Sequence, residues 1–298
     1  MKNVFYFLIF PGFLFTAILG LLLTWLDRKI TARLQWRVGP PWHQPFLDFF
    51  KLLGKEIIIP EGGSVFVFFF APVVGVTAVA VISTVLWLVL IAPAQSFNGD
   101  LIVVLYLSII PALSVILGGF ASGNPLASLG ASREMKLMLS YELPFILSVF
   151  IPVILSGGLI SLNGLIGYQK ESGIFLRHIS CMLAFMVSII CIQAKLTLVP
   201  FDSPEAETEL ASGGLVEYSG AALAIYKLTK AINFLCMPLF LTVIFLGGRI
   251  FLLPFIILVI IILKNTNPRI RIDQAAVFFW GPVTAVAAIA VFLAFLGF

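Results

Sequence analysis

Residues 199–230 read VPFDSPEAETELASGGLVEYSGAALAIYKLTK and carry the densest group of charges in the chain. Apolar segments flank this stretch on both sides. An acidic residue near or inside a lipid bilayer is energetically costly, so it is a candidate functional residue by default. The stretch holds five of the chain's 14 acidic residues, namely Asp202, Glu205, Glu207, Glu209 and Glu217.

The composition of the whole chain shows why such a stretch is unusual. Of the 298 residues, 61% are hydrophobic and only 11% are charged, and the mean hydropathy is +1.13. Soluble domains are roughly half apolar and about one quarter charged. Apolar runs long enough to span a bilayer recur along the entire length. The sequence therefore predicts an all-α polytopic membrane protein embedded in a lipid bilayer.

We expect a single integral membrane domain over residues 1–298 with eight transmembrane helices and, in the first cytoplasmic loop, an interfacial amphipathic helix. The eight spans are placed at about 4–26, 65–92, 101–121, 138–160, 174–198, 217–247, 250–264 and 275–297. The cytoplasmic loops are then 27–64, 122–137, 199–216 and 265–274.

The distribution of cations predicts the orientation of these spans. Because cytoplasmic loops are enriched in Lys and Arg, the richer side is assigned to the cytoplasm of a multi-pass protein in the cell membrane. Both termini then lie outside, and the acidic stretch faces the cytoplasm. Twelve of the 18 cations lie on the richer side: Arg28, Lys29, Arg33, Arg37, Lys51, Lys55, Arg133, Lys136, Lys195, Lys264, Arg269 and Arg271.

The first cytoplasmic loop is too long to be a simple turn. Within it, Gln44, Asp48, Lys51 and Lys55 recur at helical spacing with aromatic residues and leucines opposite them. One interpretation is a polar connector; the length and charge favour a docking surface for a partner. The predicted docking residues, including those of two later loops, are Arg28, Arg33, Arg37, Asp48, Lys51, Lys55, Glu56, Arg133, Arg269 and Arg271.

Acids and lysines that reach from the cytoplasmic surface towards the membrane midplane suit proton or ion movement. Burial raises the pKa of carboxyl groups and lowers that of lysines, so both kinds exchange protons near neutral pH. Lys227 and Lys230 are expected to lie deep in the sixth span; the alternative is that they extend to the headgroups. The predicted relay consists of Glu142, Asp202, Glu205, Glu207, Glu209, Glu217, Lys227 and Lys230.

Redox chemistry within the chain is not expected. Three cysteines without a CxxC motif and two distant histidines cannot build an iron–sulfur cluster or a zinc site. No phosphate-binding loop is present, and we expect no metal, no catalytic residue and no nucleic-acid partner. Two function classes remain: a secondary transporter, and an ion-conducting subunit that docks onto a larger complex. The two halves of the chain show no convincing repeat, and the large loops on one side favour the second class.

The sequence resembles the membrane subunit shared by respiratory complex I, where it is called NADH dehydrogenase subunit 1, and the energy-converting nickel–iron hydrogenases. The most specific block is Pro200-Phe201-Asp202 with Pro204-Glu205-Ala206-Glu207 and Val216-Glu217-Tyr218. Four further blocks match within residues 27–40, 44–56, 129–142 and 269–280. The resemblance implies that the subunit joins a membrane arm to a peripheral redox arm. It also implies coupling of electron transfer to proton or sodium movement through neighbouring antiporter-like subunits.

Three departures from the complex I pattern argue against quinone binding, whereas Gly39-Pro40-Pro41 with Gln44-Pro45-Phe46, and Lys227, look more like the hydrogenase branch. Only residues 41–43 separate Gly39-Pro40 from Gln44-Pro45, where complex I has a longer insert beside its quinone. Lys195 and Leu198 stand where complex I has a glutamate and an arginine. We therefore expect partners that are hydrogenase-like, with a nickel–iron centre and iron–sulfur clusters, and that receive electrons from ferredoxin. The alternatives are the quinone-site subunit of complex I and a stand-alone transporter.

Overall fold

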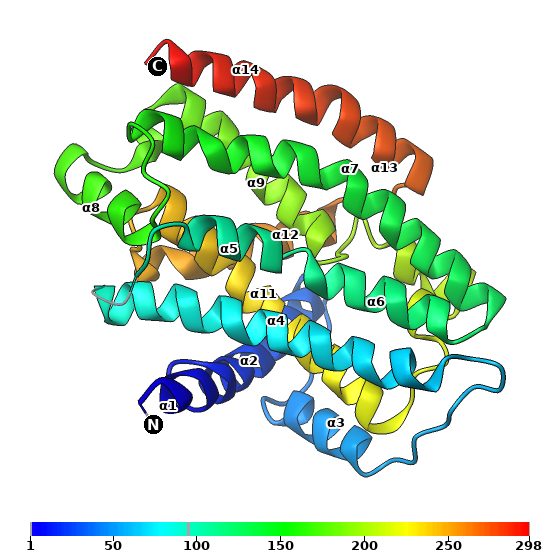
Figure 1. The fold of residues 1–298 in the computed structure, drawn as a ribbon. Helices are drawn as coiled ribbons and strands as arrows, with labels where there is room; N and C mark the ends of the chain where they lie inside the picture. The colour runs from blue at the N-terminus through cyan, green and yellow to red at the C-terminus, as the bar shows by residue number, and fades with distance from the viewer. Residues whose placement is uncertain (1, 94–95, 298) are drawn as a thin grey trace.

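The computed structural model describes residues 2–93 and 96–297, excluding the side chains of residues 2–4, 207 and 208. Within these ranges the regular structure is helical, and no strand is formed (Figure 1). Helices are expected here because lipid cannot satisfy backbone N–H and C=O groups, and a helix satisfies them within one segment.

Six helical segments are long and apolar enough to cross a membrane: Phe5–Leu34, Val65–Ile91, Asp100–Ala121, Pro125–Leu155, Gly220–Phe245 and Ile272–Phe295. Two shorter apolar segments, Ile179–Lys195 and Ile250–Thr266, lie at two further positions where the sequence predicts spans. The individual helices are α1 (Lys2–Leu8), α2 (Phe13–Leu34), α3 (Gln44–Leu53), α4 (Val65–Ile91), α5 (Asp100–Leu107), α6 (Ile110–Ala121), α7 (Pro125–Leu155), α8 (Leu162–Ser172), α9 (Ile179–Lys195), α10 (Glu207–Leu210), α11 (Gly220–Phe245), α12 (Leu253–Thr266), α13 (Ile272–Phe278) and α14 (Thr284–Phe295).

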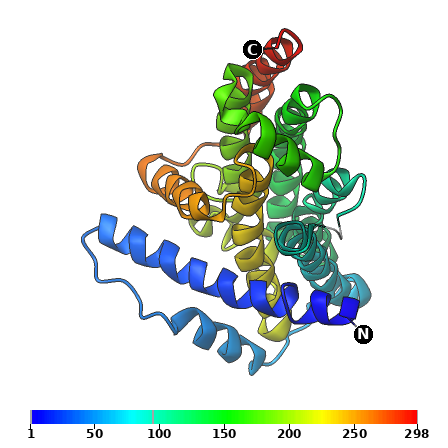
Figure 2. The same cartoon turned by 90° about the vertical axis from the view of Figure 1, so that its left-hand side faces the viewer.

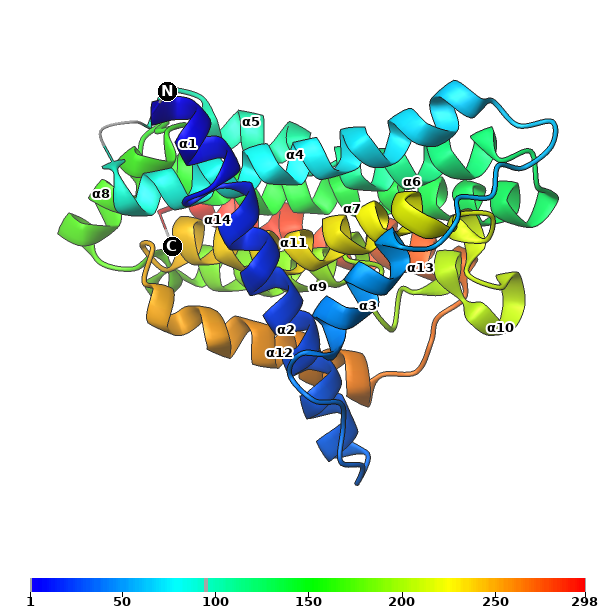
Figure 3. The same ribbon diagram turned by 90° about the horizontal axis from the view of Figure 1, so that it is seen from below.

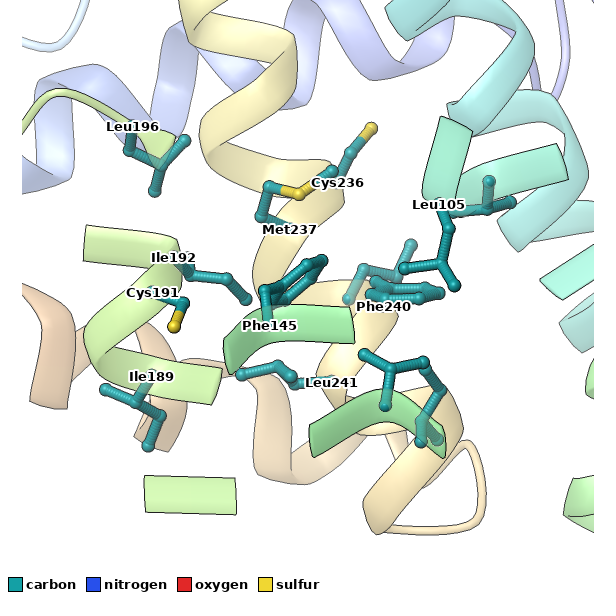
Figure 4. Packing of buried hydrophobic residues seen from close by; sticks show 14 of the residues in the cluster. Leu105, Phe145, Ile189, Cys191, Ile192, Leu196, Cys236, Met237, Phe240 and Leu241 are labelled. Atoms are coloured by element: carbon teal, nitrogen blue, oxygen red, sulfur yellow. The ribbon is translucent and has the colours of Figure 1, made fainter. Parts of the chain in front are cut away.

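Helix α11 forms the centre of the bundle. In the most apolar 18-residue stretch of this helix 94% of the residues are buried. The helix packs against α2 and α4. Figure 2 shows it surrounded by the other helices. The rings of Phe145 on α7 and Phe240 on α11 are 6.2 Å apart, and Figure 4 shows them beside Met237 and Leu241. Burial on all sides explains why α11 is apolar around most of its circumference.

The two ends of the bundle differ. Both termini and α8 lie at one end, whereas α3, α10 and the turn between α6 and α7 lie at the other (Figures 1 and 3). Three segments that the sequence assigns to the cytoplasm are thus gathered in the half of the bundle away from the termini. This arrangement is compatible with termini on one common side; the cytoplasmic assignment of that end stays a prediction.

Several boundaries differ from the predicted ones. Helix α7 begins at Pro125, so most of the expected loop 122–137 is helical. The side chain of Asn124 caps this helix by accepting a hydrogen bond from the Leu126 N–H at 2.8 Å, and proline suits the first turn. Similarly, α2 continues to Leu34, which places Arg28 and Arg33 on a helix and not in a loop. The short helix α8 occupies a segment for which no element was predicted.

Helix α11 begins at Gly220 and not at Glu217. Gly220 has a φ of +57°, and a Cβ there would lie 2.7 Å from the Lys55 carbonyl oxygen, so the turn requires glycine. Consequently Lys227 lies only about two turns into the helix. It is exposed, which corrects the expectation that it is buried at mid-span. Lys230, one turn further on, is partly buried.

Candidate functional site

A cavity of about 290 Å³ opens between α2, α3 and α11. Both apolar and charged side chains line it, which is unusual for a space that faces the membrane-spanning helices. We call it the outer cavity. Its charged lining residues are Asp27, Arg28, Asp48, Glu205, Lys227 and Lys230.

An ion pair between Glu205 and Lys230 lies at the inner end of this cavity. The carboxylate comes from the short 3-10 helix Ser203–Glu205, and the ammonium group comes from α11. Their side chains are 24% and 37% exposed. Both residues also line a second, smaller cavity of about 40 Å³, the inner cavity. The ion pair therefore separates the two cavities.

A second ion pair lies beyond the inner cavity. Lys195 Nζ is 3.2 Å from a Glu142 carboxylate oxygen, and the Lys195 side chain is only 1% exposed. The ammonium group also donates a hydrogen bond to Ser108 Oγ at 2.7 Å and lies 4.3 Å from the Phe145 ring centroid. A buried lysine is stabilised by these contacts because little water solvates it.

The inner cavity also contacts two buried polar groups for which the sequence analysis predicted no role. Glu134 is 3% exposed and Asn233 is 4% exposed. Glu134 Oε2 and Asn233 Oδ1 have no hydrogen-bond partner among the described residues. A helical reading of residues 125–137 would have placed Glu134 on the same face as Leu137 and Tyr141, which are buried. Because a loop was expected over residues 122–137, this helical spacing was not considered.

The remaining predicted relay acids lie nearer the surface. Glu209 is 60% exposed and pairs with Arg133 at 2.5 Å. Glu217 accepts a hydrogen bond from Asn124 Nδ2. The Glu207 side chain is outside the described part of the chain. Glu209 and Glu217 therefore line neither cavity, and the relay role of all three acids stays a prediction.

Asp202 is buried beside a single cation. Its Oδ2 is 2.8 Å from Arg269 Nε, while Oδ1 has no hydrogen-bond partner among the described residues. Burial raises the pKa of Asp202 above its usual value, although Arg269 opposes this shift.

Three of the predicted docking arginines gather around one surface hollow of about 340 Å³, formed by Arg133, Arg269 and Arg271 together with Glu209 and Asp273. Arg133 bridges to Glu209 and donates a hydrogen bond to the Ser203 carbonyl at 3.3 Å. The Arg133 hydrogen bond lowers the pKa of Glu209 below its usual range. The hollow is thus a charged surface at the end of the bundle that carries α10.

The predicted docking residues of the first loop are mostly exposed. Arg28 pairs with Asp48 at 3.0 Å, and Gln44 donates a hydrogen bond to Asp48 at 2.8 Å. Burial raises the pKa of Asp48, but hydrogen bonds from Arg28 and Gln44 outweigh it, so the net shift is downward. The other docking residues of this loop extend into solvent: Arg33, Arg37, Lys51, Lys55 and Glu56.

A family model described as NADH dehydrogenase matches residues 7–295. The chain belongs to the NADH dehydrogenase subunit 1 family. It is 36% identical over 285 residues to the H subunit of NADH-quinone oxidoreductase from Syntrophotalea carbinolica, covering 85% of this chain and 84% of that one. Its identity to the same subunit from Thermomicrobium roseum is 34% over 306 residues, with coverage of 90% and 88%.

A solved structure also matches this family member over almost its whole length. A chain of the membrane-bound sulfane sulfur reductase, an archaeal respiratory membrane complex, superposes with a TM-score of 0.89 at 27% identity. The match covers 99% of this chain and 100% of that one. The chain is therefore similar to a membrane subunit of complex I-like assemblies in both sequence and fold.

The two positions that depart from the complex I pattern both border the cavities. Lys195 forms the buried pair with Glu142, and Leu198 lines the outer cavity. Of the two positions that the resemblance singled out, one thus places a cation inside the bundle and the other an apolar side chain at the outer cavity.

Metal ligands were not expected in this chain. Over residues 2–93 and 96–297, no group of three or more His, Cys, Asp or Glu residues has the arrangement of a metal site. The presence of metal centres in partner subunits stays a prediction.

Proposed function

We propose that this chain is the membrane subunit of an energy-converting respiratory complex. It docks a peripheral redox arm and couples electron transfer to the movement of protons or sodium ions. In this proposal the chain crosses the cell membrane eight times, α3 lies along the cytoplasmic interface, and both termini face outwards. The chain itself carries no redox centre.

The observation that carries this proposal is the arrangement of two ion pairs around the inner cavity. The Glu205–Lys230 pair and the buried Lys195–Glu142 pair lie on either side of the inner cavity, which polar and apolar side chains line within the bundle. Buried ion pairs rarely improve stability over apolar packing, because desolvation offsets the attraction. Charges kept in such a place are therefore better explained by ion movement than by stability.

The family likeness and the surface charges support docking. The arginines around the hollow at Arg133 lie at the end of the bundle that carries α10, and α3, which contributes a cation of the first loop, lies in the same half. A peripheral arm with acidic patches would be attracted there. Neighbouring antiporter-like subunits would contact the lipid-facing sides.

The proposed electron source is ferredoxin, and the proposed peripheral subunits are hydrogenase-like, with a nickel–iron centre and iron–sulfur clusters. Lys195, Leu198 and the short connection at residues 41–43 support this branch.

A second candidate is a quinone-site subunit of complex I. The outer cavity favours it, because a space of about 290 Å³ with an amphipathic lining would admit an apolar ring with polar substituents. Under this alternative, electrons leave the peripheral arm at the cavity mouth.

Purification of the native complex separates the candidates. The hydrogenase branch predicts co-elution of nickel and iron with this subunit and ferredoxin-dependent hydrogen evolution that quinone analogues do not inhibit. Bound quinone and inhibition by its analogues would support the second candidate instead. A subunit that elutes alone would contradict both.

A further inference from the structure

Glu134 is the described buried acid that has neither a hydrogen bond nor an ion pair to any described residue. It lies on α7 and is 3% exposed, and its Oε2 is unpartnered. Glu142, on the same helix, has Lys195 as its counter-ion. A buried carboxyl group without any partner is unfavourable in a folded protein, so its retention calls for an explanation.

The space beside Glu134 is lined by both polar and apolar side chains. The inner cavity of about 40 Å³ brings Glu134 together with Asn233, whose Oδ1 is also unpartnered. A cavity of this size and polarity has room for water, which would donate hydrogen bonds to both oxygens. The same cavity contacts Lys195 on one side and the Glu205–Lys230 pair on the other. Glu134 thus lies between the two ion pairs.

We infer that Glu134 is a proton carrier between these two pairs and that the inner cavity is its hydrated proton-binding site. This inference rests on the ion-coupling function proposed above. A proton enters from the outer cavity and binds the Glu205 carboxylate, which weakens its pairing with Lys230. The O–H bond on Glu205 then breaks as an O–H bond forms on Glu134, through water in the cavity.

The second transfer returns Glu134 to its carboxylate form and leaves the proton on Glu142. The O–H bond on Glu134 breaks, and the proton passes to the Glu142 carboxylate beside Lys195. Glu205 and Glu134 are carboxylates again, one positive charge has moved inwards, and no electrons are exchanged. Tyr226 also lines the cavity but donates its hydrogen bond to the Ser114 carbonyl at 2.8 Å, so it is not needed in this route.

The charges around the cavity favour a proton over a sodium ion. The lining of the inner cavity carries as many ammonium groups as carboxylates, so it offers a metal cation no excess of negative charge. A proton on Glu134, in contrast, leaves a neutral carboxyl group that needs no further counter-ion.

The test uses the complete complex, purified from its native membranes and reconstituted into vesicles that contain a pH-sensitive dye. Glu134→Gln keeps the shape of the side chain but cannot carry a proton. We expect proton uptake per electron to fall at least tenfold with an unchanged yield of assembled complex. Glu134→Asp, which keeps the carboxyl group, should retain most of the uptake. Glu171→Gln on α8 is the matched control and should have no effect.

Infrared difference spectroscopy gives a readout that does not require the variant to turn over. The wild-type complex should show a band of a buried protonated carboxyl group that shifts in D₂O. This band should be absent in Glu134→Gln and displaced in Glu134→Asp. A spectrum that is identical in all three proteins would overturn the inference, as would uptake in Glu134→Gln within twofold of the wild type.

Two further outcomes separate this inference from the function on which it rests. If Glu205→Gln stops uptake but Glu134→Gln does not, the role of Glu134 is refuted and the coupling function stands. If wild-type vesicles take up sodium ions but no protons, the proton site is refuted while ion coupling stands. If the wild-type complex moves no ion, both proposals are refuted.

Discussion

Two buried acids, Asp100 and Glu134, lie at opposite ends of the bundle and differ in their hydrogen bonds. Asp100 is fully buried, and its oxygens accept hydrogen bonds from the Leu162 N–H at 2.6 Å and from Ser96 Oγ at 2.7 Å. It ties the start of α8 to α5. Glu134 has no such partners and faces the inner cavity. The contrast indicates that burial alone does not identify a functional acid. A better indication is a carboxylate oxygen that has no hydrogen-bond partner and borders a cavity large enough for water.

Removing a counter-ion near the inner cavity should give the largest effect. Lys195→Met leaves the Glu142 carboxylate without its partner, and loss of one member of a buried pair typically costs about 3–5 kcal/mol. We expect a large fall in the yield of folded complex, measured by quantitative blotting of membranes. The double variant with Glu142→Gln should recover most of the yield but not ion transport. Equal yields for the single variant and the wild type would show that the pair is not buried.

Removing the satisfied acid should affect stability but not coupling. Asp100→Ala leaves the Leu162 N–H without its acceptor, and an unsatisfied buried group costs about 1–3 kcal/mol. Thermal unfolding of the purified complex should therefore begin at a lower temperature, while ions moved per electron stay unchanged. A selective loss of ion coupling in Asp100→Ala would remove the distinction between the two acids.

The acid just before α11 tests how far the relay extends. Glu217→Gln retains an oxygen that can accept the Asn124 hydrogen bond, so assembly should be unaffected. If Glu217 carries protons, turnover coupled to ion movement should fall about tenfold, equivalent to roughly 1.4 kcal/mol in activation free energy. Turnover within twofold of the wild type would restrict the relay to the residues that line the two cavities.

Features that depend on residues close together in the sequence could be predicted. Long apolar runs predicted the positions of the helical segments, because the hydrophobic pattern is local in sequence. The helix at Gln44–Leu53 was predicted from the spacing of its polar residues, and the structure contains it. The cluster at the acidic stretch was also visible in the sequence. Each of these signals lies within a single segment.

The inner cavity could not be predicted because its lining residues come from segments that are distant in the chain. Lys195 was counted on the cytoplasmic side at the end of the predicted span 174–198, yet it pairs with Glu142 of α7 inside the bundle. Glu205 meets Lys230 only because the chain folds back between residues 206 and 219. Glu134 was missed because Pro125 and Asn124 start α7 earlier than the turn-rich composition suggested.

The surface charges should have a smaller effect than the buried ones. Arg133→Ala removes the contact with Glu209, and exposed ion pairs contribute little. We expect a roughly two- to fivefold loss of the peripheral arm during purification. Lys170→Ala, an exposed cation at the opposite end, is the matched control. Retention of the arm at the wild-type level would argue against docking at this hollow.

The pH dependence of docking should show the smallest effect. Because the Arg133 hydrogen bond lowers the pKa of Glu209, the contact is complete above the ordinary glutamate value of 4.5 and is lost as the pH falls through the lowered pKa. Retention of the arm should therefore decline in this acidic range, and Arg133→Ala should remove that component. An identical decline in the variant would assign it to other groups.

The central claim is that ions move through the charged route at the Glu205–Lys230 pair. The most direct test compares ion uptake per electron by reconstituted complexes that carry Glu205→Gln, Lys230→Met or neither change. We predict that both variants assemble and transfer electrons within the detached peripheral arm, but that uptake falls at least tenfold. Uptake equal to that of the wild type in both variants would contradict the claim.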